Sequence, residues 1–322
     1  MHPNECSLPK PANKYLDALA AKGRKTSTIK RYRYDLLDYY SYVHEHVQPD
    51  EQLPTYESLS TFFTEIIEKR NYKYKTYKRI HTVLLRYGAY LCEMRWQSVN
   101  PVEDITLPES DEDELSVEDL FSHREVDQLL RSIHSDNGLS ETQQKSRPLL
   151  APRNLIMIRL LLFYGLRLQE LYGLQIDDWQ RPGRLHVKPL DGEVLPRTIS
   201  LSQADRTYLR DYLDVIPTPV QPVLGSEHPL FISFDYQRQT YRWSYEEDMP
   251  KRLTIVAMQK MIREELKRAG LPLGRSAQHM RHTFIVRSLE NDEPLSSLQQ
   301  KLGLHSPLVL QRYEQLALKD ES

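Results

Sequence analysis

Two short segments carry an arginine in a setting where it could hold an anion. The segment GLRLQEL at 165–171 follows an apolar run and places Arg167 three residues before Glu170, so a cation is followed by an acid that can support it. The segment AQHMRHTF at 277–284 places Arg281 between two histidines on a predicted helix. Each alone has an ordinary explanation, either a surface ion pair or a buried structural histidine.

A third segment could supply a nucleophile. The stretch LGLHSPLVLQRY at 302–313 ends in Tyr313, close to the end of the chain. A phenolic hydroxyl can attack an electrophile, but one tyrosine among 20 has no special claim to that role.

Two runs of basic residues without an acid could bind a phosphate backbone. They span 22–33 and 69–86, and tyrosines lie within both. Clustered cations displace counterions from nucleic acid, and helix faces fit the major groove. A solvated helix face is the alternative for one such run, but two runs in one region favour nucleic-acid contact. The bases are Lys22, Arg24, Lys25, Lys30, Arg31 and Arg33, then Lys69, Arg70, Lys73, Lys75, Lys78, Arg79 and Arg86.

Helices are expected to position the basic runs. Apolar residues at helical spacing predict two helices between residues 12 and 47, the second capped by Thr26 or Ser27. Further helices are predicted at 56–69 and 75–92. The first region is therefore predicted to be all-helical.

The second region mixes helices with a small sheet. Ser122 and Glu125 have capping-box spacing, 135–148 reads as a loop, and buried helices are predicted at 154–165 and from residue 168. Alternating residues predict strands at 185–188 and 198–201, joined by a turn at Asp191–Gly192, and a third strand at 230–233. Helices are predicted at 254–269, 277–289, 295–302 and 307–318.

Composition indicates a globular protein of about two domains. The chain has 322 residues, of which 39% are hydrophobic and 27% charged, which excludes a disordered or membrane class. Two cysteines exclude a disulfide framework and argue against a cysteine-based zinc site. The N-terminus lacks the pattern of a secretory signal, so a cytoplasmic location is expected.

The net charge of −2 conceals a local contrast. Residues 109–119 carry seven acids and no base, whereas the regions before and after them are both basic. We therefore expect a flexible tail at 1–11, a helical domain at 12–107, an acidic linker at 108–121 and a second domain at 122–322. A near-neutral total does not exclude a nucleic-acid partner.

Taken together and in this order, the segments resemble the tyrosine recombinase (phage integrase) family, in its simple two-domain form. The stretch at 25–42 is similar to that family's DNA-binding helical module, as is the stretch at 94–108. The three segments above resemble the first-arginine, second-arginine and nucleophile boxes. The resemblance implies a mainly α fold: an N-terminal helical core-binding (SAM-like) domain and a mixed α/β catalytic domain with a small antiparallel sheet.

The resemblance also implies roles for individual residues. Tyr313 would attack a DNA phosphate and form a 3′-phosphotyrosyl bond, while Arg167 and Arg281 bind its non-bridging oxygens. Lys188 would give a proton to the leaving 5′-oxygen, and Glu170 would orient the arginines. Neither a metal nor a nucleotide cofactor is expected.

Two histidine positions depart from the family pattern. The family has histidine three residues before the second arginine, where this chain has Gln278, and His279 is the alternative occupant. On a helix, Gln278 lies about 60° around from Arg281 and His279 about 160°. His282 is interpreted as a packing histidine of this box. The family also has histidine or tryptophan nine residues before the nucleophile; Leu304 stands there, and we expect His305 to take the role.

The lysine position departs too, since the hairpin at 187–197 is longer than in the family. Arg197 is the alternative to Lys188, but a guanidinium does not readily release its proton.

These inferences favour a site-specific DNA recombinase, in which two protomers bind an inverted-repeat core site and two sites join in a tetramer. The role would be mobile-element integration or excision, which we favour, or dimer or cointegrate resolution. Two alternatives remain: a DNA-binding protein of this fold with weak or no catalysis, and a type IB topoisomerase-like enzyme.

Overall fold

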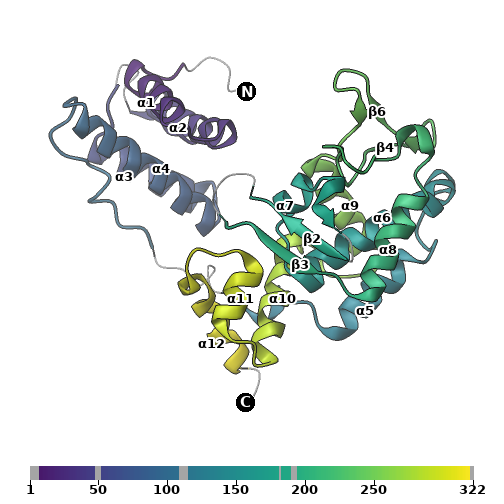
Figure 1. Cartoon of the computed structure of the whole chain (residues 1–322). Helices are drawn as coiled ribbons and strands as arrows, with labels where there is room; N and C mark the ends of the chain where they lie inside the picture. Colours follow the sequence, from purple (N-terminus) through teal and green to yellow (C-terminus); the bar gives the residue numbers. More distant parts are fainter. Residues whose placement is uncertain (1–6, 48–51, 109–114, 181–182, 190–193, 320–322) are drawn as a thin grey trace. The chain divides into compact units, whose positions relative to one another are not determined.

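The computed structural model describes residues 7–47, 52–108, 115–180, 183–189 and 194–319. The chain divides into two compact units, Met1–Glu114 and Leu115–Ser322, each with its own hydrophobic core (Figure 1). The structure confirms the mainly helical fold class with small antiparallel sheets. No helix within the described ranges is long and apolar enough to cross a membrane.

Unit 1 is entirely helical in its described residues. Its elements are α1 (Lys10–Ala21), α2 (Thr26–His46), α3 (Tyr56–Thr64), the π-helix η1 (Glu65–Lys69) that continues α3, and α4 (Tyr74–Glu93). Tyrosines fill much of the core, and several of their hydroxyls are hydrogen-bonded there: Tyr39 Oη lies 2.7 Å from Ser58 Oγ, and Tyr40 Oη lies 3.0 Å from Tyr87 Oη. These rings supply apolar surface while their hydroxyls stay paired, whereas the buried Tyr15 hydroxyl has no hydrogen-bond partner among the described residues.

Two boundaries in unit 1 differ from expectation. The cap of α2 is Lys25, without a side-chain hydrogen bond, so Thr26 opens the helix and does not cap it. Leu8 and Pro11 are buried, and α1 begins at Lys10, so packing starts within the stretch predicted as a tail. Proline is tolerated there because the first turn of a helix needs no backbone donor. Residues 1–6 of that stretch lie outside the described residues.

Unit 2 combines helices with small antiparallel sheets. The helices are α5 (His123–Ile133), α6 (Glu141–Tyr164), α7 (Leu168–Gly173), α8 (Gln203–Asp214), α9 (Ile255–Arg268), α10 (Ala277–Glu290), α11 (Leu295–Leu302) and α12 (Gln311–Lys319). The sheet has the antiparallel order β1 (Trp179–Gln180), β2 (Arg184–Val187), β3 (Arg197–Ser200). Two short hairpins follow, β4 (Phe234–Asp235) with β5 (Thr240–Tyr241) and β6 (Trp243–Ser244) with β7 (Met249–Pro250). The predicted capping box of Ser122 and Glu125 is confirmed at α5, whereas α8 was not predicted.

Helix α6 starts well before the predicted position. The stretch 135–148 was expected to be a loop, but α6 begins at Glu141 and contains Pro148 and Pro152. Tertiary contacts hold this first half in place: the Arg147 guanidinium lies 2.6 Å from the Glu265 carboxylate of α9 and donates to the Ile133 carbonyl oxygen of α5. These buried bonds offset the backbone donors that the prolines lack.

The strands agree only in part with the sequence analysis. The two predicted strands correspond to β2 and β3, paired with Val187 opposite Arg197; the predicted turn at Asp191–Gly192 lies outside the described residues. The predicted third strand at 230–233 is wrong, since only an isolated bridge joins Ile232 to Arg252 there. A short buried apolar run has no periodicity that identifies it as a strand.

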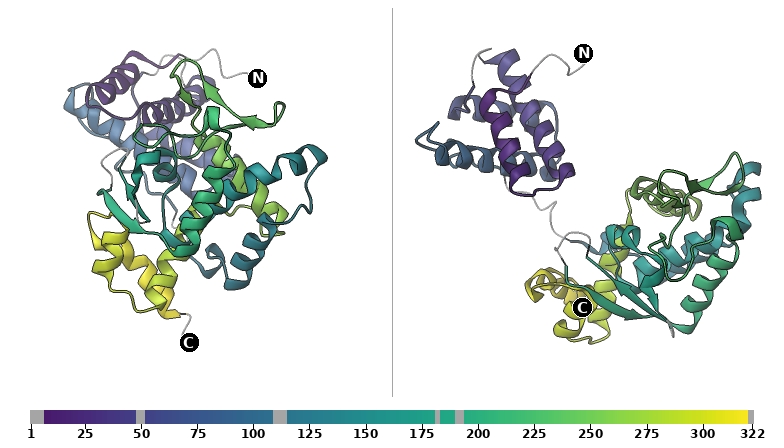
Figure 2. Two further views of the ribbon diagram at one scale, coloured as in Figure 1. Left: turned by 45° about the vertical axis from the view of Figure 1, so that its right-hand side comes forward. Right: turned by 45° about the horizontal axis from the view of Figure 1, so that its top comes forward.

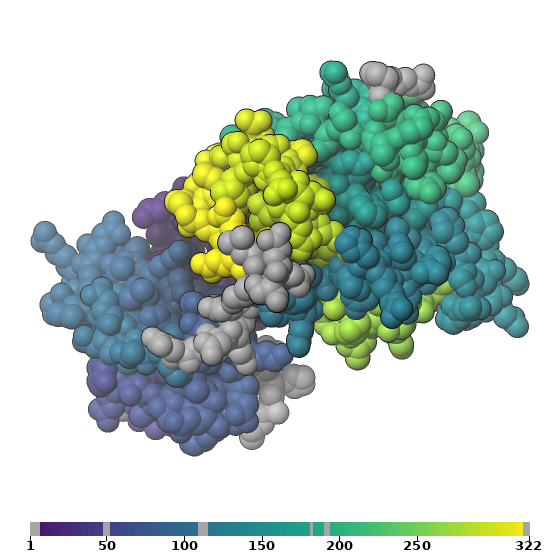
Figure 3. All heavy atoms as spheres, turned by 90° about the horizontal axis from the view of Figure 1, so that it is seen from below, coloured from purple at the N-terminus to yellow at the C-terminus, as the bar shows by residue number. Residues whose placement is uncertain are grey.

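The C-terminal helices form a separate small core. Residues of α10, α11 and α12 pack together around Leu298, Leu302 and Leu310, and α11 contacts β3. Figures 2 and 3 show the yellow C-terminal segment as one group. The expected single helix at 307–318 is a 3-10 turn (η6, Pro307–Leu310) followed by α12. Gly303 has a φ of 64°, and a Cβ there would lie 2.5 Å from the Leu195 carbonyl oxygen, so this close approach requires glycine.

Candidate active site

Arg167 is positioned by the break between α6 and α7. Gly165 ends α6 in the left-handed conformation with a φ of 61°. Arg167 then precedes α7, and its backbone N–H donates to Glu170 Oε2 at 2.7 Å. The acid three residues on therefore fixes the backbone that carries the arginine, as the spacing suggested.

Glu170 joins three arginines through one buried carboxylate. It accepts from Arg197 Nη1 at 2.7 Å and Nη2 at 2.8 Å, and Arg281 Nη1 lies 4.0 Å from Oε2. Burial raises the pKa of Glu170, but the hydrogen bonds and charges of Arg197, the Arg167 N–H and the charge of Arg281 outweigh it, so the pKa lies below its ordinary value. The carboxylate is thus ionised at neutral pH. The sequence analysis had not identified Arg197 as its partner.

Arg281 lies on α10 and is 9% exposed. Its Nη1 donates to the Gly165 carbonyl oxygen, which ties α10 to the end of α6. Burial lowers the pKa of Arg281 to about 10, with Glu170 opposing and the charges of Arg167 and Arg197 adding to the decrease. The guanidinium remains protonated at neutral pH and is poorly compensated, so it favours an incoming anion.

Tyr313, on α12, is 3% exposed and has two partners at its hydroxyl. His282 Nδ1 lies 2.8 Å from Tyr313 Oη, and Arg312 Nη2 donates to the same oxygen at 2.8 Å. Burial lowers the pKa of His282 to about 4, with the charges of Arg312 and His279 adding to the decrease. His282 was interpreted as a packing residue; it is a direct partner of the candidate nucleophile. The only signal in the sequence was its place directly after Arg281.

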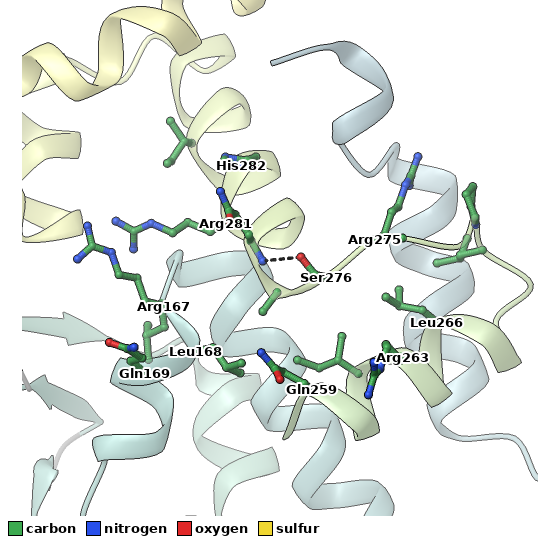
Figure 4. A pocket seen from close by; sticks show the side chains of 18 of the residues that line it. Arg167, Leu168, Gln169, Gln259, Arg263, Leu266, Arg275, Ser276, Arg281 and His282 are labelled. Carbon is green, nitrogen blue, oxygen red and sulfur yellow. Dashed lines mark hydrogen bonds between the residues drawn. The ribbon is translucent and has the colours of Figure 1, made fainter. Parts of the chain in front are cut away.

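A pocket of about 820 Å³ brings these groups together. Arg167, Gln278, Arg281, His282 and Tyr313 all line it, although they come from three separate segments of the chain. Figure 4 shows Arg167, Arg281 and His282 around this hollow, with side chains of α9 along another wall. The arrangement places two guanidinium groups and one phenol where a phosphodiester could enter.

Gln278 and His279 occupy different settings at the start of α10. Gln278 is exposed and lines the pocket. His279 Nδ1 accepts from the Ser276 backbone N–H at 3.1 Å, and its Nε2 lies 3.5 Å from Asp119 Oδ1. The helix start thus uses His279 in its cap and leaves Gln278 facing the pocket.

Leu304 and His305 occupy different settings, and the expected role of His305 stays a prediction. Leu304 is 6% exposed, lines the pocket and belongs to the small C-terminal core. His305 is exposed and does not line the pocket. The reason is the left-handed turn at Gly303, after which the Leu304 N–H donates to the Gln299 carbonyl oxygen and its side chain turns inward.

Lys188 stands directly after β2, outside the pocket lining. Its Nζ forms an ion pair with Asp178 Oδ1 at 2.7 Å, and its side chain is 54% exposed. The alternative, Arg197, is buried against Glu170. Lys188 is therefore the more accessible cation of the two.

Within the described residues, no group of three or more acids, histidines or cysteines could hold a metal ion.

The basic residues of unit 1 are exposed, with one exception. Arg79 is partly buried and forms a two-point ion pair with the buried Asp35, at 2.9 and 3.1 Å. Arg79 thus has a structural partner. The exposed members of the predicted DNA-binding set are Lys22, Arg24, Lys25, Lys30, Arg31, Arg33, Lys73, Lys75, Lys78 and Arg86.

Comparisons with known proteins show the family and the fold to which the chain is similar. Residues 120–319 match the model of the phage integrase family. The chain is 23% identical to the tyrosine recombinase XerD of Oceanobacillus iheyensis over 291 residues, 88% of this chain and 85% of that protein. Its fold is similar to XerH recombinase bound to palindromic difH DNA, with a TM-score of 0.68, 18% identity and coverage of 96% and 82%. It is also similar to the Tn1549 transposon integrase in complex with a circular intermediate DNA, with a TM-score of 0.67, 17% identity and coverage of 98% and 99%.

Proposed function

Because the chain belongs to the phage integrase family and is a tyrosine site-specific recombinase, we propose that it cuts DNA through Tyr313. Attack of the phenolic oxygen on a backbone phosphate would give a 3′-phosphotyrosyl bond and release a 5′-hydroxyl. The covalent bond conserves the energy of the phosphodiester, so that the exchange is reversible. The observation that carries this proposal is the shared pocket of Tyr313, Arg167 and Arg281.

The arginines stabilise the transition state in this mechanism. Negative charge builds on the non-bridging oxygens as the tyrosine attacks, and planar guanidinium forks of Arg167 and Arg281 match those oxygens. Glu170 holds both from behind, through the Arg167 backbone and the charge on Arg281. Gln278 adds a hydrogen bond to a phosphate oxygen but no proton transfer near neutral pH.

Lys188 protonates the leaving 5′-oxygen. Its ammonium is on the hairpin of β2 and β3, paired with Asp178. A DNA phosphate would compete with Asp178 for this cation, so that the proton donor is delivered when substrate binds. His305 stays a candidate for a role on bound DNA, although it does not line the pocket of the protein alone.

The substrate is double-stranded DNA with an inverted-repeat core site. We infer two protomers on each site and a tetramer when two sites meet. Support comes from the palindromic DNA of the XerH complex and from the exposed basic side chains of unit 1. The similarity to a transposon integrase and the altered histidine positions favour integration or excision of a mobile element in the cytoplasm over chromosome-dimer resolution.

A supercoiled plasmid carrying the DNA that flanks this gene tests the proposal. Wild-type protein and Tyr313→Phe are incubated with it and quenched with detergent, and DNA-linked protein is then detected. An adduct from the wild type alone supports the proposed nucleophile. Tight binding by both proteins without any adduct favours the second candidate, a DNA-binding protein of this fold without catalysis, which the presence of Leu304 in the pocket motivates.

A further inference from the structure

We propose that His282 is a catalytic residue that takes the phenolic proton of Tyr313 during strand cleavage and returns it during religation. This inference rests on the proposed function and adds a proton acceptor to it. Gln278, the residue at the usual histidine position, cannot take a proton near neutral pH. The structure places a different histidine, one residue after Arg281, against the reacting oxygen.

The hydrogen bonds at Tyr313 define which way the proton can go. Arg312 can only donate, so Tyr313 Oη accepts at 2.8 Å from Nη2. The phenolic hydrogen is then available to His282 Nδ1, also 2.8 Å away. The two rings lie 5.5 Å apart between centroids, tilted by 40°. A general base must be within about 2.6–3.2 Å of the atom it deprotonates, and His282 meets that requirement.

The surroundings of His282 keep its lone pair free for this proton. Burial lowers its pKa to about 4, and the charges of Arg312 from α12 and of His279 and Arg281 from α10 act in the same direction. Asp119, in the 3-10 turn at Val117–Asp119, opposes them. A phosphate between Arg167 and Arg281 would add negative charge near the ring, which favours the imidazolium. The ring is therefore neutral at rest and gains proton affinity when DNA arrives.

The atoms balance in each direction. In cleavage, the bond from Tyr313 Oη to phosphorus forms while the bond from phosphorus to the 5′-oxygen breaks. The phenolic proton passes to His282 Nδ1, and the 5′-oxygen takes a proton from the Lys188 ammonium. In religation, the 5′-hydroxyl attacks, Lys188 regains its proton, and the imidazolium returns its proton to Tyr313. Arg312 stabilises negative charge on the phenolic oxygen in both directions.

The dependence of cleavage on pH tests this assignment on the flanking-DNA plasmid. Rates of adduct formation are measured between about pH 6 and 9 for the wild type, His282→Asn, His282→Ala and the matched control His134→Asn. His134 is exposed at the C-terminal end of α5, where its backbone N–H donates to the Arg131 carbonyl oxygen. Melting temperature and plasmid binding verify that each variant is folded.

We expect a nearly flat profile for the wild type and for the control. Both His282 variants should cleave roughly 10²–10⁴-fold more slowly at neutral pH. Their rates should rise with pH, because the tyrosine must then lose its proton to hydroxide. Added imidazole should restore part of the rate of His282→Ala.

Three outcomes decide whether His282 accepts the proton of Tyr313. Slow cleavage with a rising profile and imidazole rescue supports His282 as the proton acceptor. Folded His282 variants that cleave with the rate and profile of the wild type overturn the inference while leaving the proposed function intact, and so does a slow variant with an unchanged flat profile. If the wild type itself forms no adduct on plasmid that it binds, the proposed function fails.

Discussion

Glu170 and Arg197 form a buried two-point ion pair, with N–O distances of 2.7 and 2.8 Å. Their side chains are 3% and 5% exposed, so the pair is shielded from water on both sides. One partner is on α7, next to Arg167, and the other is on β3. The pair therefore links the helix that presents the first arginine to the hairpin that carries Lys188.

Substitution Glu170→Gln should destabilise unit 2. It leaves Arg197 buried without a countercharge, and removing one partner of a buried pair costs about 3–5 kcal/mol. Urea unfolding at neutral pH measures the loss. Glu264→Gln is the matched control, because Glu264 pairs with Lys260 on the exposed face of α9 at 3.8 Å, and such pairs contribute about 0.3–0.5 kcal/mol. Equal losses in the two variants would contradict the prediction.

The same pair predicts a dependence of stability on pH. The pKa of Glu170 is lower in the folded than in the unfolded chain. The stability it contributes is therefore fully present above the unfolded value, about 4.3, and is lost as the pH falls through the folded value. The difference in unfolding free energy between wild type and Glu170→Gln should be constant from about pH 8 to 6 and shrink below about pH 4. A difference that persists unchanged to about pH 3 would argue against an ionised Glu170.

Capping residues and apolar spacing predicted most of the helices. Helix segments that depend on distant contacts were missed, because these patterns contain only neighbouring residues. The box of Ser122 and Glu125 depends only on residues three apart, and α5 begins there. The first half of α6 was missed because Pro148 and Pro152 are unfavourable in a helix, and their compensation comes from Glu265 of α9, more than a hundred residues away. A local pattern contains no information on such a partner.

For the pocket, too, the sequence identified some residues, whereas other contacts depend on tertiary packing. Arg167, Arg281 and Tyr313 could be identified from the boxes that contain them, and the structure gathers all three around one cavity. The contact of His282 with Tyr313 depends on how α10 packs against α12, and the inward turn of Leu304 depends on Gly303. Residue spacing predicts neither the contact nor the inward turn. A shift of the chain by one residue in a turn changes which side chain faces the cavity.

The salt dependence of DNA binding should separate the exposed cations of unit 1 from the structural one. The double variant Lys30→Gln, Arg31→Gln removes two exposed charges near the start of α2. If both contact phosphates, the slope of log K against log salt becomes shallower by about 2. Arg79→Gln should leave that slope unchanged and instead lower the stability of unit 1, because Asp35 loses its partner. Mobility-shift titrations at several salt concentrations, with urea unfolding in parallel, measure both effects. A slope change in Arg79→Gln alone would reverse the assignment.

Lys188→Met should slow strand cleavage without preventing DNA binding. A proton donor to the leaving 5′-oxygen contributes roughly 10²–10⁴-fold to the rate, and methionine fills a similar volume without a proton. The loss should be largely restored on DNA in which sulfur replaces the bridging 5′-oxygen at the mapped cleavage position, because a thiolate leaves without protonation. Tyr313→Phe provides the control, since it should form no adduct on either DNA. Asp178 is 3% exposed and loses its cation in this variant. The melting temperature of Lys188→Met therefore has to be measured to verify that unit 2 is still folded. Equal losses on the oxygen and sulfur substrates would show that Lys188 acts on some other step and would leave Asp178 and Lys188 as a structural pair of the hairpin.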